Sequence, residues 1–178
     1  MKTGIRIGML MAVLATLGSV DAHAQRRGGQ SVPSAPLTEA ERAAIIEVRE
    51  EEKLARDVYL TLAQRWNVPI FSNIARSESN HMAAVKTLIV KYGLPDPVVD
   101  NSVGAFTNPV FAGLYQDLVA AGSASLAEAY EVGVVIEELD IDDLTEALLV
   151  VEKLDIRTVF ENLLSGSENH LAAFESRL

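Results

Sequence analysis

Two segments of this chain repeat one pattern of residues. Residues 76–85 read RSESNHMAAV and residues 165–174 read SGSENHLAAF, so asparagine, histidine, an apolar residue and two alanines recur in the same order. The whole chain has three histidines, and the repeat contains two of them, His81 and His170. The repeat therefore indicates two related halves, each of which supplies one histidine.

Helical spacing of apolar residues runs through most of the chain, broken by residues that start or stop helices. Thr38-Glu39-Ala40-Glu41 is a capping box, which predicts the first start, and Gly93 is placed to end the second helix. The predicted helices cover residues 38–66, residues 71–92, residues 109–122, a stretch from Ser123 or Ser125 to Val151, and a stretch from about Asp155 to the C-terminus.

No stretch alternates between apolar and polar residues as a half-buried strand would, so the chain is predicted to be all-α. Residues 94–108 form a long connection with two prolines and a glycine. Two helical hairpins joined by a long crossover that contains a short extra helix describe the ferritin-like four-helix bundle.

The N-terminus has the composition of a targeting segment. Two basic residues precede the apolar run 7–20, and small residues then flank position 23, which predicts a cleavable signal peptide over residues 1–24. A membrane anchor is the alternative, but the run is shorter than the roughly 20 residues that a spanning helix needs. Residues 25–37 are predicted to be a flexible leader and residues 38–178 a single domain. The mature protein is then expected in the periplasm or outside the cell.

The charge of the chain narrows its possible partners. The formal net charge is −10, which disfavours nucleic acid and suits the attraction of metal ions. The chain has no cysteine, so disulfides cannot stabilise it. No membrane association is expected after the signal peptide is removed, and assembly with identical chains is compatible with the sequence.

Five residues are predicted to bind metal. Glu78 and His81 are three residues apart, which places their side chains side by side on a helix. Glu52 and Glu137 lie on helix faces otherwise made of core-type residues, and His170 does so in the last helix. Buried carboxylates need a partner, and a carboxylate or histidine from each of four helices can form a dimetal site. Such ligands favour iron or manganese, bound as two ions or one, and the ligand types do not decide between the two metals.

The motifs around these residues resemble a known superfamily. Residues 52–59, EKLARDVY, look like the first-helix motif of rubrerythrin-type ferritin-like proteins, and Glu78-x-x-His81 looks like their second-helix ligand pair. The ordered set EEKLARDVY, SESNHM, VVIEELDIDDL and GSENHLAAF is similar to the uncharacterised ferritin-like domain of unknown function 2202, over residues 38–178. This resemblance implies that the five predicted residues bind iron, and that paired metals react with dioxygen or peroxide.

One position departs from the superfamily pattern. The residue three before the second histidine of the repeat is Ser167 instead of glutamate, and Glu168 is displaced by about 100° around the helix. The second metal site is then weak, completed by water, or filled by Asp140. Glu138 and Glu51 are the alternatives if the helical phase is shifted by one residue.

The polar neighbours of Glu52 have simpler interpretations. Glu50, Glu51 and Lys53 are predicted to form a solvated helix face with local ion pairs. Asp57 is expected on the same face, or as a residue that orients a ligand histidine. Tyr59 is expected in the core.

Two classes of function follow from these predictions. The first is an exported dimetal-carboxylate oxidoreductase of the ferroxidase or peroxidase type, which oxidises Fe(II) or reduces dioxygen or peroxide. The second is a protein without catalysis, either a metal-binding protein or a metal-free helical interaction module.

Overall fold

The computed structural model describes residues 36–178, and this part of the chain is entirely helical, with no strands. The all-α prediction is therefore confirmed. The predicted signal peptide and most of the predicted leader lie outside the described residues. None of the described helices is both long enough and apolar enough to cross a membrane. The helices are α1 (Glu39–Trp66), α2 (Pro69–Tyr92), α3 (Pro109–Gly122), α4 (Leu126–Val150) and α5 (Leu154–Glu175).

The helix ends follow the residues that the sequence singles out. The Thr38 hydroxyl accepts from the backbone N–H of Glu41, whose carboxylate accepts from the Thr38 N–H, so the capping box is present. Gly93 ends α2 with a φ of 63°, a conformation that suits glycine. α2 begins at Pro69, slightly earlier than predicted, because proline fits the first turn of a helix.

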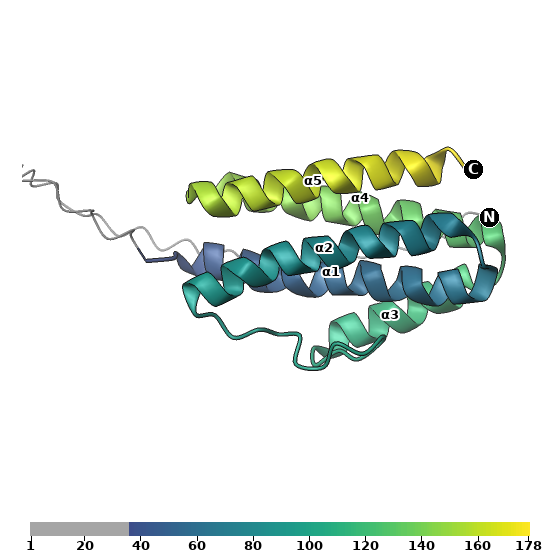
Figure 1. Ribbon diagram of the computed structural model, residues 1–178, viewed down its shortest axis with the longest axis horizontal. Coiled ribbons are helices and arrows are strands. Elements are labelled where there is room, and N and C mark those ends of the chain that lie inside the picture. Colours follow the sequence, from purple (N-terminus) through teal and green to yellow (C-terminus); the bar gives the residue numbers. More distant parts are fainter. Residues whose placement is uncertain (1–35) are drawn as a thin grey trace, which may run out of the picture. The chain divides into compact units, whose positions relative to one another are not determined.

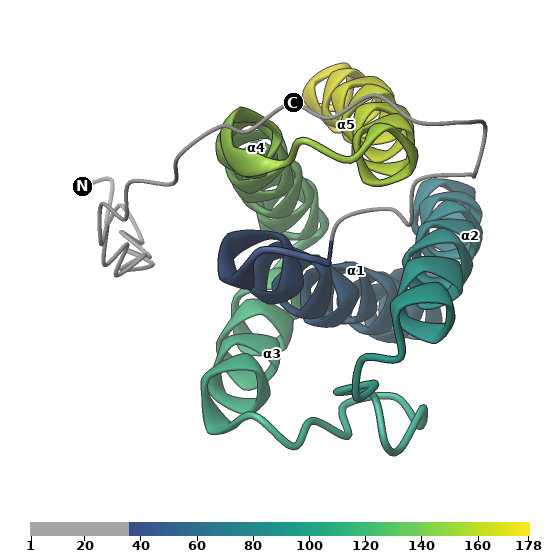
Figure 2. The same cartoon turned by 90° about the vertical axis from the view of Figure 1, so that its left-hand side faces the viewer.

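Four long helices, α1, α2, α4 and α5, lie alongside one another, and α3 packs outside them (Figure 1). The view along the helices shows the α1–α2 hairpin facing the α4–α5 hairpin (Figure 2). α1 contacts α4 and α2 contacts α5, so the two hairpins meet along two seams. α3 contacts α1 and α4, and the crossover that leads to it passes beside α1.

Two separate apolar clusters fill the space between the helices. The first cluster contains aromatic residues such as Phe71 and Phe174, and the second contains residues such as Ile45, Leu144 and Phe160. Along each of the four long helices, the residues of one cluster are separated from those of the other by a segment that contains buried polar residues, such as Glu52, Glu78, Glu137 and His170. The polar layer between the clusters is where the predicted metal ligands lie.

The prediction of a solvated face on α1 is wrong. Glu50, Glu51 and Lys53 are 7%, 7% and 1% exposed. Helical periodicity shows that these residues share a polar face, but it does not show that α3, α4 and the crossover cover that face. A buried polar face on α1 therefore needs partners, and its lysine finds one in Asp57.

Candidate metal centre

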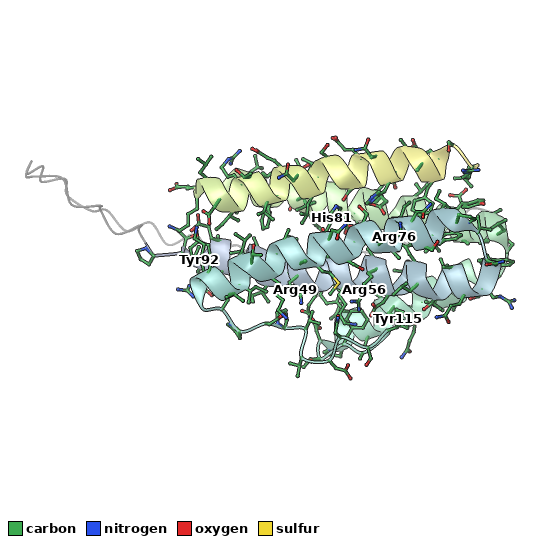
Figure 3. The ribbon with its side chains drawn as sticks, viewed as in Figure 1. Arg49, Arg56, Arg76, His81, Tyr92 and Tyr115 are labelled. Carbon is green, nitrogen blue, oxygen red and sulfur yellow. The ribbon has the colours of Figure 1, made fainter. Side chains whose placement is uncertain are left out.

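All five residues predicted as metal ligands come together in the polar layer. Their nitrogen and oxygen atoms form two groups, and the atoms within each group lie within 4.8 Å of one another. Glu78 belongs to both groups. His81 lies between α2 and α5 (Figure 3), and its ring centroid is 5.6 Å from that of His170. The five-residue centre consists of Glu52, Glu78, His81, Glu137 and His170.

Glu78 lies between the two histidines and contacts one with each carboxylate oxygen. Its Oε2 is 2.7 Å from Nδ1 of His81, and its Oε1 is 2.8 Å from Nδ1 of His170. Glu52 Oε2 lies 3.2 Å from the same nitrogen of His81, and Glu137 Oε2 lies 3.5 Å from that of His170. The centre therefore has two similar halves. One contains Glu52 and His81, the other contains Glu137 and His170, and Glu78 belongs to both.

Most of these atoms are buried without forming a hydrogen bond. Within the described residues, both oxygens of Glu78, Oε2 of Glu137 and Nδ1 of His170 have no hydrogen-bond partner of acceptable geometry. Buried polar atoms are normally hydrogen-bonded, and leaving one unpaired is costly. Nitrogen and oxygen atoms that converge at short range without hydrogen-bonding are arranged as ligands around an ion would be.

The charges of the centre favour a cation. Burial raises the pKa of Glu78, but contact with His170 and His81 outweighs burial and brings this pKa to about 2. Burial lowers the pKa of each histidine, but the carboxylates beside them raise the pKa of His81 to about 10 and that of His170 to about 9. Burial also raises the pKa of Glu52 to about 8. A site that holds two imidazoles in their charged form stabilises positive charge, which a metal ion would also supply.

Tyr59 is buried in the core as predicted, but it also contacts the centre. Its hydroxyl donates to Oε1 of Glu137 at 2.7 Å. This hydrogen bond occupies one oxygen of Glu137 and leaves the other, Oε2, on the side of His170. Glu52 and Tyr59 are seven residues apart, which puts both on one side of α1. This spacing is the sequence feature from which a contact between Tyr59 and the centre could be predicted.

The residues proposed to complete the second half behave differently from one another. Ser167 is fully buried, and its hydroxyl donates to the backbone carbonyl of Leu163 at 3.3 Å instead of joining the centre. Glu168 and Glu138 are exposed, so neither lies in the polar layer. Asp140 is buried, and its Oδ2 has no hydrogen-bond partner among the described residues. Asp140 therefore lies inside the fold, and so does Glu51, the alternative on α1, which is also buried.

Asp57 does not orient a histidine. Its carboxylate accepts from Lys53, from Nε of Arg56 at 2.8 Å and from the backbone N–H of Gly104 at 2.9 Å. Arg56 lies on the side of α1 that faces the crossover, away from His81 (Figure 3). Asp57 thus fixes the crossover to α1, a role that the local sequence does not reveal because Gly104 is distant along the chain.

Gly166 makes room for His81. A β-carbon at this position of α5 would lie 2.6 Å from both Cε1 and Nε2 of the His81 ring. Such a distance is too short for a real contact, so the ring would have to move. A glycine in the middle of a helix otherwise costs about 1 kcal/mol relative to alanine. The requirement for space beside His81 accounts for glycine here.

We expect Gly166→Ala to weaken metal binding in one half of the centre only. The added methyl group displaces the His81 ring, so the half with Glu52 and His81 should lose its metal while the half with His170 keeps it. Stability without metal should change by about 1 kcal/mol or less, because the helix propensity of alanine offsets the weakened contacts of His81 with Glu52 and Glu78. Metal analysis of the dialysed protein, together with thermal unfolding, measures both effects.

Gly113→Ala in α3 is the matched control, because a β-carbon there meets nothing within 4 Å. This variant should gain helix stability and bind metal as the unchanged protein does. If Gly166→Ala binds as much metal as Gly113→Ala, then Gly166 does not position His81.

The chain is similar to proteins known from sequence and structure. Residues 41–178 match the family described as "Uncharacterized protein domain (DUF2202)". The "Uncharacterized protein MJ0754" of Methanocaldococcus jannaschii is 52% identical over 144 residues, which are 81% of this chain and 78% of that protein. The crystal structure of the hypothetical protein MJ0754 matches with a TM-score of 0.78, covering 82% of this chain and 83% of that chain. These similarities concern family and fold rather than activity.

Proposed function

The chain belongs to the DUF2202 family, and from the geometry of the five-residue centre we propose that it is a ferritin-like protein that binds two ions of iron, or of manganese. The two hairpins, the long crossover and the motifs that resemble rubrerythrin-type proteins support the ferritin-like assignment. The proposal includes export to the periplasm or beyond, which rests on the sequence of residues 1–24.

One observation carries the proposal for a dimetal centre. Glu78 contacts a different histidine with each of its oxygens, and neither oxygen is hydrogen-bonded. A carboxylate that uses both oxygens in this way is suited to bridge two ions. Glu52 and Glu137, each of which belongs to one half only, then supply the remaining carboxylate of that half.

The donor set favours iron or manganese. It contains carboxylate oxygens and imidazole nitrogens, without the thiolates that characterise many structural zinc sites. Each half offers three protein ligands, which leaves positions for water or an oxidant. Bound iron would supply electron transfer to dioxygen or peroxide, and this chemistry makes oxidation of Fe(II) the proposed activity.

The protein side chains hold the carboxylates of the centre in fixed, buried positions. The two apolar clusters lie on either side of the polar layer, and Glu52, Glu78 and Glu137 are buried between them. Tyr59 holds Glu137 by one oxygen, so the other oxygen stays beside His170. Glu52, which contacts His81, keeps that imidazole turned toward Glu78.

A second candidate function is metal binding without catalysis, and Ser167 favours it. Where the superfamily pattern has a second glutamate that could be shared, the Ser167 hydroxyl is turned to its own helix backbone. The centre then has one shared carboxylate instead of two, and it carries less negative charge with which to stabilise Fe(III). Such a centre can hold Fe(II) or Mn(II) for storage or stability.

Anaerobic loading followed by exposure to oxidant tests the proposal and separates the two candidates. The purified protein should bind two Fe(II) ions per chain at the centre, and adding dioxygen or peroxide should form Fe(III) faster than in protein-free buffer. His81→Ala and His170→Ala should each bind fewer ions and lose the oxidation. Binding without faster oxidation would select the second candidate, and no binding at all would rule out both.

A further inference from the structure

A second group of carboxylates lies beside the five-residue centre, at the contact between α1 and α4. Two of these residues are four apart on α1 and two are three apart on α4, so each pair lies on one side of its helix. The two helices contact each other, and the side chains of Glu51 and Asp143 interact. The seam carboxylates are Glu47, Glu51, Asp140 and Asp143.

Two of the seam carboxylates are buried with an unpaired oxygen. Glu51 is 7% exposed and Asp140 is 6% exposed. Among the described residues, Oε1 of Glu51 and Oδ2 of Asp140 have no hydrogen-bond partner. Outside the five-residue centre, these two are the only buried side-chain nitrogen or oxygen atoms of residues 36–178 that lack a hydrogen-bond partner. Each is an acceptor that needs a donor or a cation.

No basic residue in the described part of the chain forms an ion pair with this group. The groups that act on Glu51 are Asp143, whose side chain lies within hydrogen-bonding reach of it, Glu47 and Glu52, and all three are carboxylates. Those that act on Asp140 are also carboxylates, with Glu52 the strongest. The buried basic residues of α1 are used elsewhere, since Lys53 and Arg56 pair with Asp57 and Arg49 pairs with Asp96. Burying several carboxylates together is unfavourable unless a proton or a cation joins them.

The spacing of these oxygens differs from that of the centre. Within the described residues, the groups whose ligand atoms all lie within 4.8 Å of one another are the two halves of the centre, so the seam carboxylates are less closely gathered. A cation among them would keep part of its water shell and bind more weakly. Glu47 and Asp143 are partly exposed, and Glu47 also lines an open groove beside the crossover. The group therefore extends from solvent at Glu47 to Asp140, which adjoins Glu52.

We propose that the seam carboxylates form a second site for a divalent cation, distinct from the five-residue centre, which binds the ion with part of its water shell. The unpaired oxygens of Glu51 and Asp140 and the absence of a compensating base carry this assignment. The seam carboxylates also form the route by which cations reach Glu52. This second role rests on the proposed function. The ligand class is a hard divalent cation, because all of the donors are oxygens.

Counting bound Mn(II) by equilibrium dialysis and metal analysis tests the seam site. The double variant Glu51→Gln/Asp143→Asn should bind one ion fewer than the unchanged protein, and the lost ion should be the weakest one. The double variant His81→Ala/His170→Ala should lose the ions of the centre and keep this one. Uptake at the centre should be slower in the seam variant, with the same final occupancy there.

The outcomes separate the seam site from the dimetal centre. If the seam variant binds as much Mn(II) as the unchanged protein, the carboxylates share protons and the inference is wrong. If the seam variant loses an ion while the histidine variant loses none, the seam site stands and the proposed function fails. Equal uptake rates would leave the seam as a binding site and rule out the route.

The control variant is Glu131→Gln/Glu138→Gln, which makes the same change of charge on the exposed surface of α4. It should bind as many ions as the unchanged protein, and loss of the weak ion here would mean that net charge, not a site, attracts Mn(II). Folding is checked by thermal unfolding without metal. The seam variant should unfold at the same or a higher temperature, because neutral side chains of the same shape relieve the repulsion between carboxylates.

Discussion

Replacing Glu78 with glutamine should remove both metal ions from the centre. Glutamine has nearly the same shape, but its amide cannot bridge two cations as a carboxylate can. Glu78 belongs to both groups of ligand atoms, so its loss affects both halves, whereas loss of His81 or His170 affects one half each. Metal analysis after anaerobic loading should therefore give no tightly bound ion in Glu78→Gln and one in each histidine variant.

Thermal unfolding provides an independent readout of the same prediction. An ion that binds only the folded protein must stabilise it, so added Mn(II) should raise the unfolding temperature of the unchanged protein. Added Mn(II) should raise the unfolding temperature of Glu78→Gln only slightly. Glu168→Gln, the same change at an exposed position of α5, is the control and should respond fully. A Glu78→Gln variant that still binds one ion tightly would show that Glu78 is not shared.

The largest loss of stability is expected from Asp57→Ala, on the opposite side of α1. Asp57 is fully buried and pairs with Lys53, which is 1% exposed, and with Arg56. Removing Asp57 leaves a buried ammonium group without its carboxylate and frees the N–H of Gly104. Breaking a buried ion pair in this way typically costs about 3–5 kcal/mol. Urea unfolding of the metal-free protein measures the loss.

Two further variants separate the cause of this loss. Asp57→Ala/Lys53→Met should be more stable than Asp57→Ala alone, because the uncompensated buried charge is then absent. Glu161→Ala removes the partner of an exposed pair with Arg157 and should cost about 0.5 kcal/mol or less. Metal binding by the folded fraction of Asp57→Ala should be unchanged. A loss no larger than that of Glu161→Ala would mean that the crossover does not depend on Asp57.

The fold was largely predictable because local chemistry sets the helix ends. The capping box at Thr38 and the left-handed Gly93 each act through nearby backbone groups, so sequence alone reveals them. What covers each helix is a property of the whole fold. The burial of Glu50, Glu51 and Lys53 could not be predicted, because it depends on α3 and on a crossover that is distant along the chain.

The centre was predictable to a similar degree. Helical spacing predicted that Glu78 and His81 would be neighbours, and the repeat pointed to His170 as their counterpart. The shared position of Glu78 and the hydrogen bond from Tyr59 to Glu137 depend on how the hairpins meet, and no local pattern encodes that. The same reason explains why the sequence alone could not show that Asp140 lies inside the fold.

The most direct test of the dimetal centre is the anomalous scattering of crystals grown with Mn(II). The account predicts two peaks in the polar layer between the apolar clusters, each within bonding distance of a different oxygen of Glu78, with one beside His81 and the other beside His170. Crystals in which Mn(II) binds only at the surface, with the five side chains keeping their contacts and no peak among them, would contradict it.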